Sequence, residues 1–256
     1  MSFSHTPQPI SPLQRYVPTL LAILILLACI ERIYGIDRQS LWSDELFAIT
    51  ASFKPTWASL WSLLVSDSHP PGYVLFMYWT LPLSGYSDIG IRLHALLFGV
   101  LWIPLVYWVG KRWFGDWAAL FAAAILVSGY NAIYYSQEAR AYTMLVAFNL
   151  INIGCFFEIL FGQSPQRRHI SGFILSTLAM LYLHYAGFVF LSAEILLYAI
   201  LWFLQQRKGS VREAAKIFGI PLLLYLPWLG IMYHHMVNAP QDWSVSAAPT
   251  LSEGLN

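Results

Sequence analysis

Residues 90–110 read GIRLHALLFGVLWIPLVYWVG, an apolar stretch with one formally charged side chain, Arg92. A helix of about 20 mostly apolar residues is long enough to cross the hydrocarbon core of a bilayer, which is about 30 Å thick. The sequence therefore predicts an all-α integral membrane protein, a bundle of about seven transmembrane helices. The six further apolar stretches lie at 16–35, 116–135, 139–162, 169–184, 186–204 and 214–234.

The composition agrees with a membrane protein and argues against a soluble one. Of the 256 residues, 58% are hydrophobic and only 11% are charged, whereas soluble domains usually carry about 25% charged residues. The formal net charge of +1 gives no indication of a nucleic-acid partner. Cys29 and Cys155 both lie in apolar stretches and lack the spacing of a metal site or a disulfide framework. We expect a lipid bilayer as a partner and no nucleic acid.

The basic residues predict the direction of the chain through the membrane. Basic pairs separate the apolar stretches at 111–112, 167–168 and 207–208. The apolar residues 71–83 would form a helix of only about 20 Å, which is too short to cross, so we expect it to lie flat on the membrane surface. All three pairs then fall on the cytoplasmic side, in agreement with the positive-inside rule.

This topology divides the chain into three regions. We expect a cytoplasmic N-terminal tail at 1–15, a transmembrane module at 16–235 and an extracytoplasmic C-terminal segment at 236–256. The membrane would be the plasma or inner membrane of a cell envelope. The long first loop of the module, 36–89, is then extracytoplasmic. An apolar stripe at helical spacing within 57–64 predicts a juxtamembrane helix in this loop, and a small soluble cap is the alternative.

Unusual polar residues gather on the extracytoplasmic side in this topology. The first loop contributes Asp44 and Glu45, and its later part contributes His69 and Tyr73. Ionisable groups at or within the membrane are costly to bury and usually mark a functional site. The remaining candidates on this side are Arg92, Gln137, Glu138, Arg140, Tyr142 and His184.

Each of these features also has a structural explanation. The Ser-Asp-Glu stretch at 43–45 is typical of a helix N-terminus, where a Ser cap precedes acidic residues. The His-Pro-Pro-Gly stretch at 69–72 can be a rigid turn, and Arg92 and Arg140 can reach lipid phosphates. Glu194, inside an expected span, is interpreted as a packed and protonated carboxyl.

Metal binding has weak support in the sequence. His234 and His235 are adjacent and have no supporting Cys or carboxylate cluster, so we expect them at the membrane interface and not as ligands. No metal site is assigned and no cofactor is expected with certainty, while a divalent metal ion stays an open alternative.

Together, the polar residues on the extracytoplasmic side suit one kind of reaction. A carboxylate can take a proton from a hydroxyl, and an arginine can bind a phosphate through its planar fork. A helix N-terminus favours the ionised carboxylate that a base requires. The combination favours displacement of a lipid-linked phosphate by an alcohol.

Seven short motifs carry a family resemblance: Trp42–Glu45, His69–Tyr73, Ile91–Leu93, Gly110–Gly115, Tyr135–Tyr142, His184–Gly187 and Leu226–Trp228. In this order they resemble the GT-C membrane glycosyltransferases of the family 39 type. These enzymes are relatives of the protein O-mannosyltransferases and of the bacterial lipid A aminoarabinose transferases. The resemblance covers about residues 16–235.

The resemblance implies an enzyme that moves a sugar from a polyprenyl-phosphate donor to a hydroxyl of a lipid, glycan or protein on the extracytoplasmic face. Asp44 would be the base and Glu45 would orient the acceptor. Arg140 and Arg92 would stabilise the leaving lipid phosphate. Attack opposite the departing phosphate implies inversion at the anomeric carbon. The residues expected to shape the site are His69, Tyr73, Gln137, Glu138, Tyr142 and His184.

Two other interpretations stay open. Family members usually continue with further spans and often a C-terminal domain, whereas this sequence stops at Asn256, so we expect a chain truncated after the seven-helix module. A truncated homologue without catalytic activity is one alternative. A transporter or lipid flippase is the other; it predicts charges through mid-membrane helices or repeated segments, for which only Glu194 is a good candidate.

Overall fold

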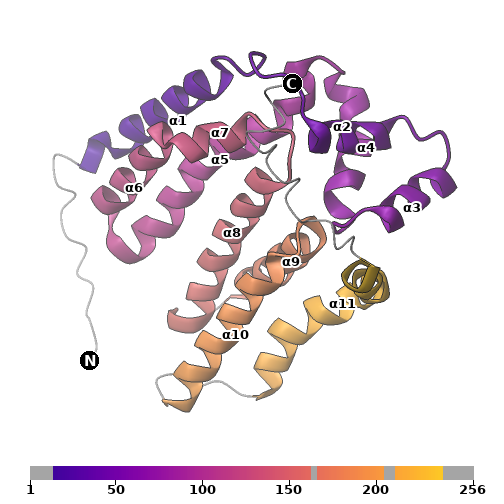
Figure 1. Cartoon of the computed structure of the whole chain (residues 1–256). Coiled ribbons are helices and arrows are strands. Elements are labelled where there is room, and N and C mark those ends of the chain that lie inside the picture. Colours follow the sequence, from indigo (N-terminus) through magenta and orange to yellow (C-terminus); the bar gives the residue numbers. More distant parts are fainter. Residues whose placement is uncertain (1–13, 163–165, 205–210, 239–256) are drawn as a thin grey trace, which may run out of the picture.

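A computed structural model of the chain describes residues 14–162, 166–204 and 211–238, and all regular elements in these ranges are helices (Figure 1). The basic pair at 207–208, most of the expected N-terminal tail and most of the expected C-terminal segment lie outside the described residues. The elements are η1 (Gln14–Tyr16), α1 (Val17–Ile33), α2 (Ser43–Ser52), α3 (Trp57–Ser66), α4 (Gly72–Ser84), α5 (Asp88–Phe114), α6 (Asp116–Ser128), α7 (Tyr130–Ser136), α8 (Tyr142–Phe161), α9 (Arg167–Leu183), α10 (Gly187–Phe203) and α11 (Val211–Asn238).

The expected all-α membrane fold is confirmed, since all seven predicted apolar stretches are helical, one of them as two helices. Four helices in the described part of the chain are long and apolar enough to cross a bilayer: η1 with α1, α5, α8 and α11. The bent pair α6 and α7 makes a fifth candidate. Helices α9 and α10 have 17 residues each, at the short end of the range for a spanning helix. The chain is a multi-pass membrane protein.

One predicted span is broken, so the continuous helix expected at 116–135 is wrong. Helices α6 and α7 meet at Gly129 with a bend of 61°. The end of α6 leaves backbone carbonyls without helical partners, and Arg32 of α1 donates to two of them, those of Leu126 at 2.9 Å and Val127 at 3.3 Å. Because Arg32 is completely buried, this contact stabilises the break in a region where water cannot replace it.

The helices follow one another through the bundle in a simple order. Helix α5 packs against α1, α6 and α8, while α9 packs against α8, α10 and α11. The short helices α2, α3 and α4 form a group at one end of the long helices (Figure 1). The loop that follows α1, the turn between α7 and α8, and the turn between α9 and α10 all reach this same end.

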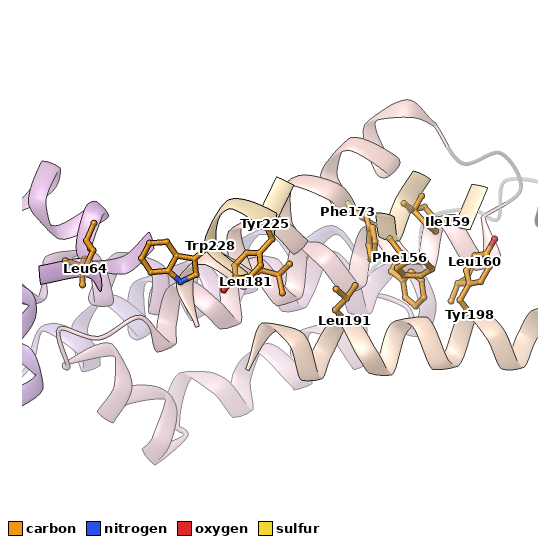
Figure 2. Packing of buried hydrophobic residues seen from close by; sticks show 14 of the residues in the cluster. Leu64, Phe156, Ile159, Leu160, Phe173, Leu181, Leu191, Tyr198, Tyr225 and Trp228 are labelled. Carbon is orange, nitrogen blue, oxygen red and sulfur yellow. The ribbon is translucent and has the colours of Figure 1, made fainter. Parts of the chain in front are cut away.

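Two clusters of buried side chains fix this end of the molecule. The larger cluster runs from Leu64 of α3 and Trp228 of α11 to Tyr198 of α10 (Figure 2), so it ties α3 to the long helices. The second cluster joins α2, α4, α5 and the start of α8 through residues such as Ile49 and Met77. These contacts hold the short helices against the bundle.

Candidate active site

Four segments that are distant in the sequence form a cavity of about 310 Å³ at the end of the bundle that carries the short helices. They are the start of α2, the segment that leads into α4, the turn before α8 and the turn after α9. The lining residues are Ser43, Asp44, Phe47, Ala48, Asp67, Ser68, His69, Pro70, Tyr73, Val74, Arg140, Ala141, Tyr142, Leu183 and His184.

An ion pair between Asp44 and Arg140 lines this cavity. The distance from Arg140 Nη1 to Asp44 Oδ2 is 2.9 Å, and the side chains are 13% and 39% exposed respectively. The Arg140 guanidinium also lies near the rings of Trp42, at 5.6 Å, and Tyr142, at 5.5 Å. Aromatic faces attract a cation, so these rings hold the guanidinium in place without using its N–H groups.

The neighbouring carboxylate, Glu45, forms a different kind of pair. It accepts two hydrogen bonds from Arg92 of α5, from Nε and Nη2, each at 3.0 Å. It also accepts from the backbone N–H of Ala139 at 2.7 Å and, more weakly, from that of Trp42 at 3.3 Å. The last contact is the side-chain half of a capping box at the start of α2. Glu45 therefore joins α2, α5 and the turn before α8.

Arg92 completes this buried network. Its Nη1 donates to the backbone carbonyls of Ile36 at 2.6 Å and Gln39 at 2.9 Å, both in the loop after α1. The side chains of Arg92 and Glu45 are 1% and 0% exposed. A buried ion pair is tolerated only when further hydrogen bonds satisfy the remaining polar atoms, and both partners here have such bonds.

The segment that leads into α4 brings two histidines together. His69 Nδ1 lies 3.2 Å from Asp67 Oδ1, and the His69 ring lies 5.9 Å from that of His184. A Cβ atom at Gly72 would approach the backbone carbonyl of Tyr182 to 2.5 Å, so only glycine allows α4 to start this close to α9. The glycine of the His-Pro-Pro-Gly motif thus places His69 beside His184.

Burial changes the pKa of three residues around the cavity. Burial and the nearby His69 and Arg140 lower the pKa of His184, which favours the neutral form of its ring. Burial raises the pKa of Glu138, with a smaller contribution from Glu45, and raises that of Tyr73 well above its ordinary value. The close pair of opposite charges at the cavity is that of Asp44 and Arg140.

The structure brings six of the ten residues expected at the site together in the cavity lining: Asp44, His69, Tyr73, Arg140, Tyr142 and His184. The other four lie outside the lining. Glu45 and Arg92 are buried against each other. Gln137 donates to the backbone carbonyls of Arg32 and Tyr34, and Glu138 is buried.

One residue near the site, His94, was not predicted from the sequence. His94 of α5 is buried, and its Nε2 lies 3.0 Å from the Tyr73 hydroxyl. A histidine inside a predicted apolar span is itself costly, and this signal would have singled out His94.

The remaining candidates from the sequence lie away from the cavity. Glu194 is buried in α10 and lies beside the side-chain amide of Asn152 in α8. His235 lies 2.9 Å from both the Tyr185 hydroxyl and the Val65 carbonyl oxygen, so it links α11 to α3. No group of three or more His, Cys, Asp or Glu side chains that could hold a metal ion occurs within the residues that the structure describes.

Comparison with known proteins gives a family and a fold. A sequence profile of the family described as dolichyl-phosphate-mannose-protein mannosyltransferase matches residues 68–232, well over half of the chain. No curated protein sequence matches the chain at a significant level.

Among solved structures, the chain is similar to the S. cerevisiae protein O-mannosyltransferase Pmt1–Pmt2 complex bound to the sugar donor, with a TM-score of 0.64 and 16% identity. The similarity covers 86% of this chain and 34% of the yeast chain, so the chain spans about a third of that protein's length. This similarity confirms the GT-C fold expected from the sequence. The profile match includes the His69 motif, Arg92, Arg140 and His184, and the chain belongs to the dolichyl-phosphate-mannose-protein mannosyltransferase family.

Proposed function

We propose that the chain is a membrane glycosyltransferase that moves a sugar from a polyprenyl-phosphate donor to a hydroxyl acceptor at the cavity between α2, α4 and α8. The observation that carries the proposal is the ion pair of Asp44 and Arg140 in the cavity lining. Mannose is the first sugar to test, because the family description names it. A lipid, a glycan or a protein can supply the acceptor hydroxyl.

Asp44 is the proposed base. Its carboxylate is partly exposed in the cavity, and it takes the proton of the acceptor hydroxyl as the oxygen attacks the anomeric carbon of the donor. The new bond joins the acceptor oxygen to this carbon, and the bond from the carbon to the phosphate oxygen breaks. Attack from the side opposite the phosphate inverts the anomeric configuration.

Arg140 is the proposed electrostatic partner of the leaving group. The phosphate leaves with the bonding electron pair and gains negative charge, and a fixed cation at that position lowers the barrier. A guanidinium has five N–H donors, and Asp44 takes the Nη1 end of this one. Arg140 can therefore contact Asp44 and a phosphate oxygen at the same time.

Glu45 and Arg92 have a positioning role in this proposal and do not contact the substrate. Their buried pair connects the residue after Asp44 to Ala139, the residue before Arg140. The network thereby fixes the spacing between base and cation. This assignment replaces the acceptor-orienting role for Glu45 and the phosphate-binding role for Arg92 that the sequence favoured.

The direct test is sugar transfer in membranes that contain the chain, supplied with radiolabelled polyprenyl-phosphate mannose and hydroxyl acceptors. Asp44→Asn should lower turnover about 10²- to 10⁴-fold, the usual contribution of a general base, without a loss of folded protein. Asp88→Asn is the matched control, because Asp88 also lies in the first turn of a helix but outside the cavity lining. Normal turnover in Asp44→Asn would exclude Asp44 as the base, and a wild-type chain that binds the donor without turnover would favour the non-catalytic alternative.

A further inference from the structure

A second and larger cavity, of about 590 Å³, lies at the opposite end of the helices. The last turns of α5, the end of α8 and the start of α9 surround it. The catalytic proposal makes no use of this end of the molecule. The lining residues are Trp108, Val109, Lys111, Arg112, Trp113, Gly154, Glu158, Gln166, Arg168 and His169.

The charges around this cavity are mainly positive. Lys111, Arg112 and Arg168 line it together with one carboxylate, Glu158. Arg112 Nε lies 2.6 Å from Glu158 Oε1, and its guanidinium lies over the ring of Trp113 at 5.2 Å. One carboxylate balances one of the three cations, so the cavity has an excess of positive charge and favours an anion.

The start of α9 adds to this preference. Gln166 is the N-cap residue of α9, and its backbone N–H donates to His169 Nδ1 at 3.3 Å. The N-terminus of a 17-residue helix carries a partial positive charge. The N-terminus of α9 lies in the lining of a cavity that also contains three cationic side chains. Its partial positive charge therefore adds to theirs and favours an anion.

An apolar groove lies beside the cavity. The groove has a volume of about 340 Å³, runs between α5, α6 and α8, and shares Val109 with the cationic cavity. Its lining contains no charged side chain. The lining residues are Val106, Val109, Gly110, Phe114, Ala118, Ala122 and Leu150.

We propose that these two adjacent sites bind one anionic phospholipid of the surrounding bilayer, with the phosphate-containing headgroup in the cationic cavity and an acyl chain in the apolar groove. Basic pockets between transmembrane helices are suited to anionic headgroups. A soluble anion would use the cavity but would leave the groove unexplained. The two tryptophans, Trp108 and Trp113, agree with a position at the headgroup level, where such rings are enriched.

The test is native mass spectrometry of the purified full chain titrated with phosphatidylglycerol or phosphatidylcholine. The wild-type chain should retain phosphatidylglycerol in preference to phosphatidylcholine. Lys111→Gln and Arg168→Gln should each lower this preference about fivefold, as expected when one cation near a lipid headgroup is lost. Arg167→Gln is the matched control: Arg167 is an exposed cation on the same turn of α9 but outside the cavity lining, so this variant should keep the preference.

Two further measurements distinguish binding of a whole lipid from a general attraction of the cationic cavity for anions. Ala118→Trp fills the apolar groove and leaves every charge in place, so it should also weaken retention of phosphatidylglycerol. Inorganic phosphate at the concentration of the lipid should not displace it. The proposal is wrong if Arg167→Gln lowers the preference as much as Arg168→Gln does, if Ala118→Trp has no effect, or if phosphate alone displaces the lipid.

Discussion

Asp44 and Glu45 are neighbours in the sequence and both pair with an arginine, but the structure gives them opposite surroundings. Glu45 and Arg92 are buried, and backbone groups satisfy their remaining polar atoms. Asp44 and Arg140 lie at the cavity, with 39% and 13% of their side chains exposed. Successive residues of a helix point about 100° apart, and this rotation sends one carboxylate into the protein and the other into the cavity.

The difference shows how one acidic pair can serve two purposes. A buried pair with all its hydrogen bonds made has little freedom to move and specifies where its helices lie. A carboxylate at the edge of a cavity remains accessible to a substrate. Asp44 and Glu45 are adjacent on α2, and Glu45 also accepts a hydrogen bond from Ala139, the residue before Arg140. The buried pair therefore fixes the geometry of the pair at the cavity. Substitutions that affect one pair but not the other test this division.

The largest expected effect on stability is that of Glu45→Gln. The change leaves the Arg92 guanidinium buried without its counter-ion, which typically costs about 3–5 kcal/mol. Heat-induced unfolding of the purified chain in detergent should show a clear loss. The double variant Glu45→Gln/Arg92→Gln removes both charges and should recover part of it. If Glu45→Gln and wild type unfold at the same temperature, the buried pair of Glu45 and Arg92 does not stabilise the fold around the cavity.

Arg140→Gln should instead act on turnover. Loss of one group that stabilises developing negative charge usually lowers turnover about 10²- to 10³-fold. The partly exposed pair with Asp44 contributes less to folding than the fully buried pair of Glu45 and Arg92, so the unfolding temperature should change much less than in Glu45→Gln. Arg38→Gln, which removes an exposed arginine near the same end of the bundle, is the control and should leave turnover intact. Unchanged turnover in Arg140→Gln would remove the arginine from the proposed reaction.

A smaller effect on stability is expected at Gly99, where α5 lies close to Ser136 of α7. A Cβ atom at this position would collide with the side chain of Ser136, which in turn accepts a hydrogen bond from Arg32 at 3.2 Å. Gly99→Ala should therefore destabilise the chain by about 1–3 kcal/mol.

Gly219→Ala is the matched comparison, because a Cβ atom at Gly219 in α11 meets nothing within 4 Å. Alanine is the better helix former, so this variant should be neutral or more stable. If both variants have the same unfolding temperature, the close contact of Gly99 with Ser136 does not contribute to stability.

The smallest expected effect is a dependence of stability on pH through His184. Burial and neighbouring positive charge lower its pKa, so the unfolded chain binds the proton more tightly than the folded one. Its contribution is complete above the unfolded pKa of about 6.5 and is lost as pH falls through the folded value. Thermal unfolding at pH of about 7.5 and 5.5 should show a larger loss for wild type than for His184→Gln. An equal loss of stability in wild type and His184→Gln would contradict the lowered pKa of His184.

Much of the fold followed from hydrophobicity, because a bilayer requires long apolar helices with internally satisfied backbones. The break between α6 and α7 at Gly129 could not be predicted from hydrophobicity. It depends on Arg32, a residue from α1 that supplies donors to carbonyls about a hundred positions away. A contact of that range leaves no local pattern in the sequence.

The site was partly predictable for the same reason. Residue type and predicted side of the membrane singled out Asp44, Arg140 and His184, which the structure brings to one cavity. The sequence assigned Asp44 as the base and Glu45 as a residue that orients the acceptor, but it did not predict that Glu45 is buried against Arg92. Both carboxylates occupy the first turn of α2 and differ only in the direction in which they point. That direction depends on where α5 places Arg92.

The most direct test of the division between the two pairs is a parallel measurement of unfolding temperature and sugar transfer for Asp44→Asn and Glu45→Gln. We expect Asp44→Asn to unfold like wild type and to lose transfer, and Glu45→Gln to unfold at a clearly lower temperature. A destabilised Asp44→Asn, or a Glu45→Gln that keeps its stability and loses transfer, would show that the roles of the two carboxylates are reversed.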